Sequence, residues 1–207
     1  MTSSAQWQRV VRAVQTALAP LLLCAAATVI AQPAPAPMAP VASPAAGPSD
    51  LPAELKNSLP QGKLIGKERL MFWGFNVYDA RLWAPAGFDP ARFGTFPLAL
   101  ELAYLRDFKA QDIAERSLKE MRRTQPIGDD QAVRWQADML RVIPDVRKGD
   151  RVTGMHRPGE GAMFWINGQP SGEIRDAEFS RLFFGIWLSP KTSELAMRAS
   201  LLGRSGE

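Results

Sequence analysis

The sequence contains very few of the residues that carry metal or nucleophile chemistry. It has one cysteine, Cys24, and one histidine, His156, among 207 residues. One thiol forms no intramolecular disulfide and one imidazole forms no histidine-rich zinc site, so both kinds of site are excluded. A catalytic triad would have to use His156, yet no Gly-x-Ser-x-Gly turn accompanies it, and a structural histidine explains it more simply. Glycine-rich phosphate-binding motifs are also missing, so we expect no metal and no cofactor.

An excess of one charge sign is also lacking. The 25 basic and 21 acidic side chains give a formal net charge of +4, which falls to +2 without Arg9 and Arg12. The remaining basic residues alternate with acidic ones along the chain. The composition therefore indicates neither a nucleic acid nor an anionic membrane surface as a partner.

The N-terminus has the pattern of an export signal. Arg9 and Arg12 precede an apolar stretch, and Val29-Ile-Ala31 then offers small residues at the positions that a signal peptidase reads. We therefore predict a signal peptide over residues 1–31, cleaved after Ala31, and a periplasmic or otherwise exported protein with no membrane span after cleavage. A retained anchor is the alternative, although the apolar run contains Pro20 and is shorter than the usual ~20 residues.

The remaining chain divides into a linker and one domain. Residues 32–49 are rich in proline and alanine and contain no aromatic residue, which predicts an extended tether. Residues 50–207 form the predicted folded domain. Its length of roughly 155 residues is enough for one domain with a sizeable core and too short for two.

Hydrophobic periodicity predicts an α+β fold, a mostly antiparallel β-sheet packed against a layer of helices. Strands come first, then two helices, then β-hairpins, then two more helices. We expect strands over residues 63–83, 96–104, 151–155, 162–166 and 173–175, and helices over residues 110–124, 129–143 and 176–187 and from 190 to 201.

Caps and turns sharpen this prediction at three places. Asp129 or Asp130 is expected to cap the second helix, and Ser189 is expected to cap the last one. Asn167 followed by Gly168 predicts a tight hairpin, since both turn positions tolerate positive φ. The second helix is predicted to carry five residues at helical spacing on its buried face: Val133, Gln136, Ala137, Leu140 and Ile143.

The first β stretch is the most informative part of the domain. From Leu70 to Trp83 it is longer than a usual strand of about 5–6 residues, so we expect a bulge, a bend or a break near Gly74. In an unbroken strand Arg69 and Tyr78 face opposite sides of the sheet. One inserted residue would place them on the same side.

Both tyrosines of the chain, Tyr78 and Tyr104, stand in apolar runs with arginines nearby. A phenol and a guanidinium at the mouth of an apolar pocket suit a carboxylate or an enolate-like oxyanion. The alternative is a satisfied core tyrosine beside a surface ion pair.

Several motifs follow one another along residues 50–203. They are Gly66-x-x-Arg69, Val77-Tyr-Asp-Ala-Arg-Leu-Trp83, Leu102-x-Tyr104, Gly149-Asp150, the hairpin of residues 161–168, Phe183-x-x-Ile186-Trp-Leu188 and Leu201-Leu-Gly203. Their order and spacing together resemble the bacterial chalcone isomerase-like family. The resemblance implies that family's fold, an antiparallel sheet and a helical layer with an apolar cleft between them. It also implies relatives of three kinds: plant flavonoid isomerases, fatty-acid-binding proteins and noncatalytic members.

The resemblance also assigns residues. Arg69 matches the arginine shared by the enzymes and the fatty-acid binders, whereas Trp73 stands where the enzymes have a threonine. Losing that hydroxyl argues against chalcone isomerisation and in favour of binding. We therefore expect Arg69 to pair with the acidic head of a small apolar, fatty-acid-like ligand, and Tyr78 or Tyr104 to donate a hydroxyl. Candidate walls of the site are Trp73, Phe75, Trp135 and Trp187.

Two other functions stay open at this point. One is a cofactor-free isomerase or intramolecular lyase that acts on a chalcone-like enone, with Arg69 as the electrostatic stabiliser. The other is a structural or partner-binding role without a ligand, for which the sequence identifies no protein partner.

Overall fold

A computed structural model describes residues 51–204. The predicted signal peptide and linker lie outside the described residues. Within the described part, no helix combines the length and apolarity needed to cross a membrane.

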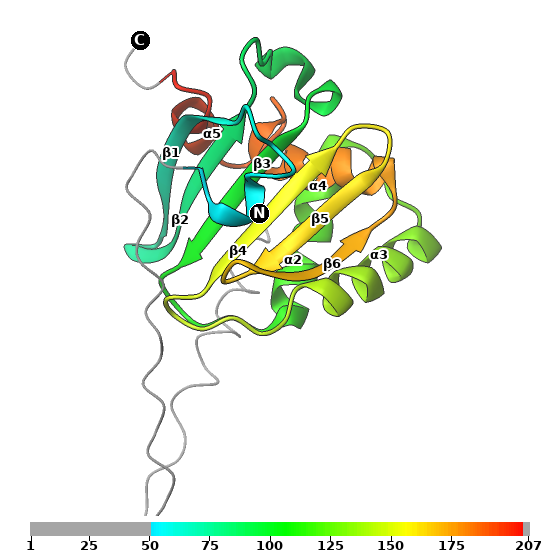
Figure 1. Cartoon of the computed structure of the whole chain (residues 1–207). Coiled ribbons are helices and arrows are strands. Elements are labelled where there is room, and N and C mark those ends of the chain that lie inside the picture. Colours follow the sequence, from blue (N-terminus) through cyan, green and yellow to red (C-terminus); the bar gives the residue numbers. More distant parts are fainter. Residues whose placement is uncertain (1–50, 205–207) are drawn as a thin grey trace, which may run out of the picture. The chain divides into compact units, whose positions relative to one another are not determined.

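The domain is built on one six-stranded antiparallel sheet whose strands are adjacent in chain order (Figure 1). This confirms the predicted α+β class. The strands are β1 (Lys63–Phe72), β2 (Phe75–Ala84), β3 (Leu98–Tyr104), β4 (Arg151–Arg157), β5 (Gly161–Ile166) and β6 (Gln169–Ile174). The helices described are α2 (Ala110–Thr124), α3 (Asp129–Val142), α4 (Ala177–Leu188) and α5 (Leu195–Leu201), with two short 3-10 helices, η1 (Ala53–Leu55) and η2 (Pro90–Thr95).

The two faces of the sheet are covered differently. Helices α2, α3 and α4 lie behind the sheet in Figure 1, while η1 crosses the opposite face. The main core forms between the sheet and the helices, where Leu82, Leu100 and Phe164 meet Phe183 and other side chains of α4. A smaller core under η1 contains Leu55, Leu59, Trp83, Ala99, Met155 and Trp165. Strand β3 is therefore buried on both faces.

Helix α3 occupies the predicted part of the sequence, but a different face of it is buried. The expected core residues Val133 and Leu140 are 66% and 40% exposed. The buried side instead carries Ala132, Trp135, Met139 and Val142. Trp135 determines which face of α3 is turned toward the core. Its indole N–H donates to an Asp176 carboxylate oxygen at 2.8 Å, and its ring packs on Phe179.

Both predicted helix N-caps are wrong. Gly128, not Asp129 or Asp130, occupies the N-cap of α3, and it provides no side-chain bond. Ser189 ends α4 as its C-cap, and α5 starts only at Leu195.

The β1–β2 stretch breaks into two strands at a two-residue turn. Trp73 and Gly74 both have positive φ, 51° and 77°, and Phe72 pairs with Phe75 across the turn. Asn167 and Gly168 repeat this geometry in the predicted β5–β6 hairpin, with φ of 51° and 82°. Both turns therefore use the left-handed backbone that matches the twist of paired strands.

Candidate functional site

The structure brings the two predicted tyrosines together on the helix-facing side of the sheet. Tyr78 of β2 pairs with Tyr104 of β3, and their rings meet edge-on with centroids 5.9 Å apart. The indole N–H of Trp187 in α4 donates to the Tyr78 hydroxyl at 2.9 Å. Tyr78 thus connects the sheet to the helical layer through one polar contact.

Burial and nearby charges set the chemistry of this pair. Burial raises the pKa of both hydroxyls, and for Tyr78 the Trp187 hydrogen bond and the charge of Arg116 act in the opposite direction. Glu194 and Glu120 add to the upward shift of the Tyr78 pKa. Both phenols therefore stay protonated near neutral pH and can donate a hydrogen bond.

An apolar cavity of about 20 Å³ lies between the central strands and α4. A space of that size holds about one water molecule. Its lining includes Trp187, which links the cavity wall to the Tyr78 hydroxyl. The other lining residues are Leu100, Leu102, Val152, Gly154, Phe164, Phe183 and Phe184. The two layers are thus nearly in contact where an apolar cleft was expected.

Arg69 lies on the opposite face of the sheet from Tyr78. The register pairs Leu70 with Tyr78 and Arg69 with Asp79, so neighbouring residues point to opposite sides. The Arg69 Nε and Nη2 atoms donate to the Asp79 carboxylate at 2.6 and 2.9 Å.

Of the two arrangements that the sequence left open, the structure has the one with Arg69 and Tyr78 on opposite faces of the sheet. The physical reason is a register shift beside the turn: Met71 pairs with Asn76 but Leu70 pairs with Tyr78, which leaves Val77 without a partner on β1. Without this shift Arg69 would pair with Tyr78 and lie on the same face.

The four aromatic residues predicted to line the ligand site do not lie together. Trp73 and Phe75, at the β1–β2 turn, are 76% and 57% exposed. Trp135 is buried between α3 and α4, and only Trp187 among the four lines the cavity. Whether Arg69, Tyr78, Tyr104 or Trp73 contacts a ligand stays a prediction.

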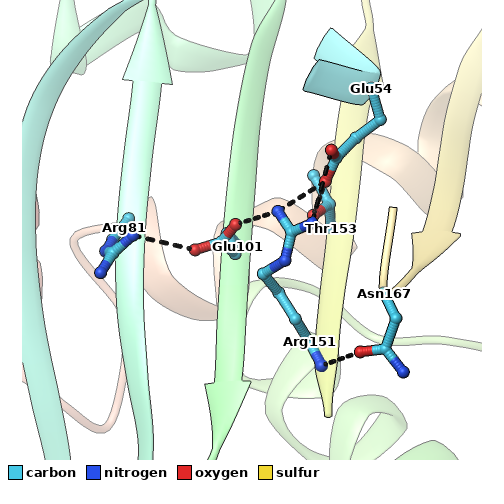
Figure 2. A network of polar contacts seen from close by, with 6 residues as sticks. All are labelled: Glu54, Arg81, Glu101, Arg151, Thr153 and Asn167. Atoms are coloured by element: carbon cyan, nitrogen blue, oxygen red, sulfur yellow. Dashed lines mark hydrogen bonds and ion pairs between the residues drawn. The ribbon is translucent and has the colours of Figure 1, made fainter. Parts of the chain in front are cut away.

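On the face opposite the helices, a buried ionic network holds η1 on the sheet (Figure 2). Arg151 Nη1 donates to Glu54 of η1 at 2.7 Å and to Glu101 of β3 at 2.6 Å. Both carboxylate side chains are 2% exposed. Thr153 donates to Glu54 at 2.9 Å, and Arg81 lies 3.5 Å from Glu101. Two carboxylates and two guanidiniums make the network neutral, which suits a structural clamp.

The single histidine also has a structural environment. His156 is 1% exposed at the end of β4, with Nε2 3.0 Å from the Gly94 carbonyl oxygen and Nδ1 2.6 Å from Ser180 Oγ. These contacts fix a neutral ring that donates from Nε2 and accepts at Nδ1. Burial lowers the pKa of His156, partly offset by the bond to Gly94.

This lowered pKa predicts a pH dependence of stability. Between the unfolded-state pKa of about 6.5 and the lower folded-state pKa, only the unfolded chain binds the proton. The stability is therefore complete above about pH 6.5 and falls below it, by at most about 1.4 kcal/mol per pH unit. Urea unfolding at pH 8, 6.5 and 5.5 measures this slope. His156→Gln should flatten it, and an equal slope in both proteins would contradict the assignment.

Comparison with known proteins decides the family. The model of the chalcone isomerase-like family matches residues 69–203, which run from the second half of β1 to just beyond α5. The chain belongs to the chalcone isomerase-like family. A 134-residue alignment relates it at 28% identity to an uncharacterized protein of Haemophilus influenzae, covering 64% of each chain. A fatty-acid binding protein of Arabidopsis thaliana shares the fold, with a TM-score of 0.54, 12% identity, and 69% of this chain and 87% of that chain covered.

Within this chalcone isomerase-like domain, sequence reasoning missed the polar surroundings of Tyr78. Arg116 and Glu120 of α2 form an ion pair of 2.9 Å, and Glu120 is only 6% exposed. Arg116 and Glu120 each stand directly before a buried residue of that helix, Ser117 and Met121. No group of potential metal ligands occurs within residues 51–204.

Proposed function

We propose that this chalcone isomerase-like protein is an exported, noncatalytic binding protein for a small apolar molecule with an acidic head, such as a fatty acid. The observation that carries the proposal is the position of Trp187. Its ring lines the apolar cavity while its N–H holds the protonated Tyr78 hydroxyl. An apolar chamber with a hydroxyl donor just behind its wall suits a ligand with one polar end. The fatty-acid binding activity named for the Arabidopsis neighbour agrees with this ligand class.

Binding requires the layers to separate locally. A cavity of about 20 Å³ is far smaller than a ligand pocket of about 300–1,000 Å³. The aromatic side chains of Phe183 and Trp187 close the space, with ring centroids 5.6 Å apart. Rotation of these two rings would open the cavity toward Tyr78 and free its hydroxyl from the indole.

The acidic head group of the ligand would then meet two side chains, one from the sheet and one from the helical layer. The Tyr78 hydroxyl donates from β2, and the Arg116 guanidinium, whose charge acts on Tyr78, lies on α2. A carboxylate between them would gain a neutral and a charge-assisted hydrogen bond. In this proposal Arg116, and not Arg69, pairs with the acidic head of the ligand. The isomerase alternative loses its electrostatic stabiliser in the same way, because Arg69 faces away from the cavity.

This account predicts that Tyr78→Phe weakens the binding of dodecanoate. The variant removes one hydroxyl donor of about 0.5–1.5 kcal/mol and keeps the ring, so the Kd should rise about two- to tenfold. Isothermal titration of dodecanoate into the full chain at pH 7 measures the change.

Arg69→Gln is the matched control on the other face of the sheet. Its Kd for dodecanoate should equal that of the unsubstituted chain, because Arg69 contacts Asp79 on the far side. A large loss of affinity in Arg69→Gln with none in Tyr78→Phe would reverse the assignment and restore the residue role implied by the sequence.

The narrowness of the cavity also favours a second candidate, a structural or partner-binding role without a small-molecule ligand. The buried core between the layers is well filled by Phe179, Phe183 and Phe184, whose rings contact one another. Absence of dodecanoate binding by the unsubstituted chain, together with no co-purified small molecule, would favour this role.

A further inference from the structure

The tip of the β1–β2 hairpin is an exposed apolar projection. Met71, Trp73 and Phe75, which we call the hairpin tip, are 58%, 76% and 57% exposed. Trp73 has a φ of 51° at the first turn position, where asparagine stands in the equivalent turn at Asn167. A bulky side chain in the left-handed region strains the backbone. Neither burial nor turn geometry therefore accounts for a tryptophan at this position.

A cation lies against the hairpin tip. The Arg106 guanidinium is exposed and sits 4.9 Å from the centre of the Phe75 ring. This combines apolar side chains, an indole and a positive charge in one projection. Tryptophan favours the level of the lipid headgroups, and arginine favours anionic phosphates at that level.

The size of the hairpin tip distinguishes a bilayer from a protein partner. Three side chains of this exposure offer on the order of 400 Å², judged from the 150–250 Å² that a large side chain buries. A standard protein interface takes about 800 Å² from each partner. A narrow projection is too small for that, but it suits shallow insertion at the boundary of headgroups and acyl chains.

We propose that the hairpin tip docks the protein on the surface of a lipid bilayer that contains anionic lipids. Trp73, Phe75 and Met71 enter the interfacial region, and Arg106 contacts lipid phosphates. The low net charge gave no indication of such a surface, because the attraction is local to the tip. The proposal is independent of the ligand between the sheet and the helices.

Trp73→Asn tests the proposal without endangering the fold, because asparagine suits the left-handed turn position. Its thermal midpoint should equal or exceed that of the unsubstituted chain. Its affinity for phosphatidylcholine vesicles with 30% phosphatidylglycerol should fall by about tenfold or more, as expected for one large apolar side chain. Val133→Ser, which removes an exposed apolar residue of α3, should bind these vesicles like the unsubstituted chain.

A second readout reports on Trp73 even if another part of the full chain also binds lipid. Lipids with brominated acyl chains should quench a portion of the tryptophan emission that is missing in Trp73→Asn. Equal quenching and equal vesicle affinity in both proteins would overturn the proposal. Dimerisation of the unsubstituted chain that Trp73→Asn abolishes, without vesicle binding, would overturn it in favour of a second copy as the occupant.

Discussion

Replacing Arg151 with methionine is expected to lower the free energy of unfolding by about 3–5 kcal/mol. Arg151 contacts both Glu54 and Glu101, whose side chains are 2% exposed. Methionine would leave two buried carboxylates, of which Glu101 keeps its longer contact of 3.5 Å to Arg81 while Glu54 loses its guanidinium partner. An unpaired buried charge costs much more than the intact pair contributes.

Arg81→Met is the matched control for this prediction. Arg81 is one-third exposed and makes the longer contact, so its loss should cost about 1 kcal/mol or less. Urea unfolding at pH 7 gives both values. Equal effects of the two substitutions would show that Arg151 does not hold the network together.

Gly66→Ala is expected to lower the free energy of unfolding by about 3 kcal/mol or more, beyond ordinary overpacking. A Cβ at Gly66 would lie 2.2 Å from the Ser200 carbonyl oxygen and 2.6 Å from that of Leu201. Both atoms belong to the backbone of α5, which packs against β1 at this point. Relief requires α5 to move away from the sheet as a unit.

Gly185→Ala in α4 is expected to raise the free energy of unfolding, whereas Gly66→Ala lowers it. Its added Cβ would meet Phe93 and Ser189 at 3.6 and 3.7 Å, which are ordinary contacts. Alanine is favoured over glycine inside a helix, so stability should rise by about 0.5–1 kcal/mol. Chemical denaturation of both variants compares them. A Gly66→Ala protein as stable as the unsubstituted chain would contradict the close approach of α5 and β1.

Local patterns predicted the parts of the fold that local chemistry determines. The bounds of α2 and the turn at Asn167 and Gly168 follow from hydrophobic spacing and from tolerance of positive φ. The rotation of α3 does not, because its sequence contains two overlapping apolar stripes. Contacts of Trp135 with Asp176 and Phe179, more than 40 residues away, decide which stripe faces the core.

The site was harder to predict than the fold, since a shift of one residue along a strand reverses the face of every side chain. Tyr78 and Tyr104 were correctly expected to lie in strands, and their pairing depends on the register of β2 and β3. The sequence did not decide between a bulge, a bend and a break near Gly74, because tryptophan is unusual where φ is positive and so did not indicate a turn. The clamp around Arg151 joins residues 97 positions apart, which sequence periodicity does not reveal.

Native mass spectrometry of the gently purified full chain tests the central claim most directly. The proposed binding site beside Tyr78 and Trp187 predicts a co-purified apolar acid in a one-to-one complex. It further predicts that the bound fraction decreases in Tyr78→Phe and is unchanged in Arg69→Gln. A spectrum of the unsubstituted chain without any bound small molecule would contradict the account, as would a ligand lost only on substitution of Arg69.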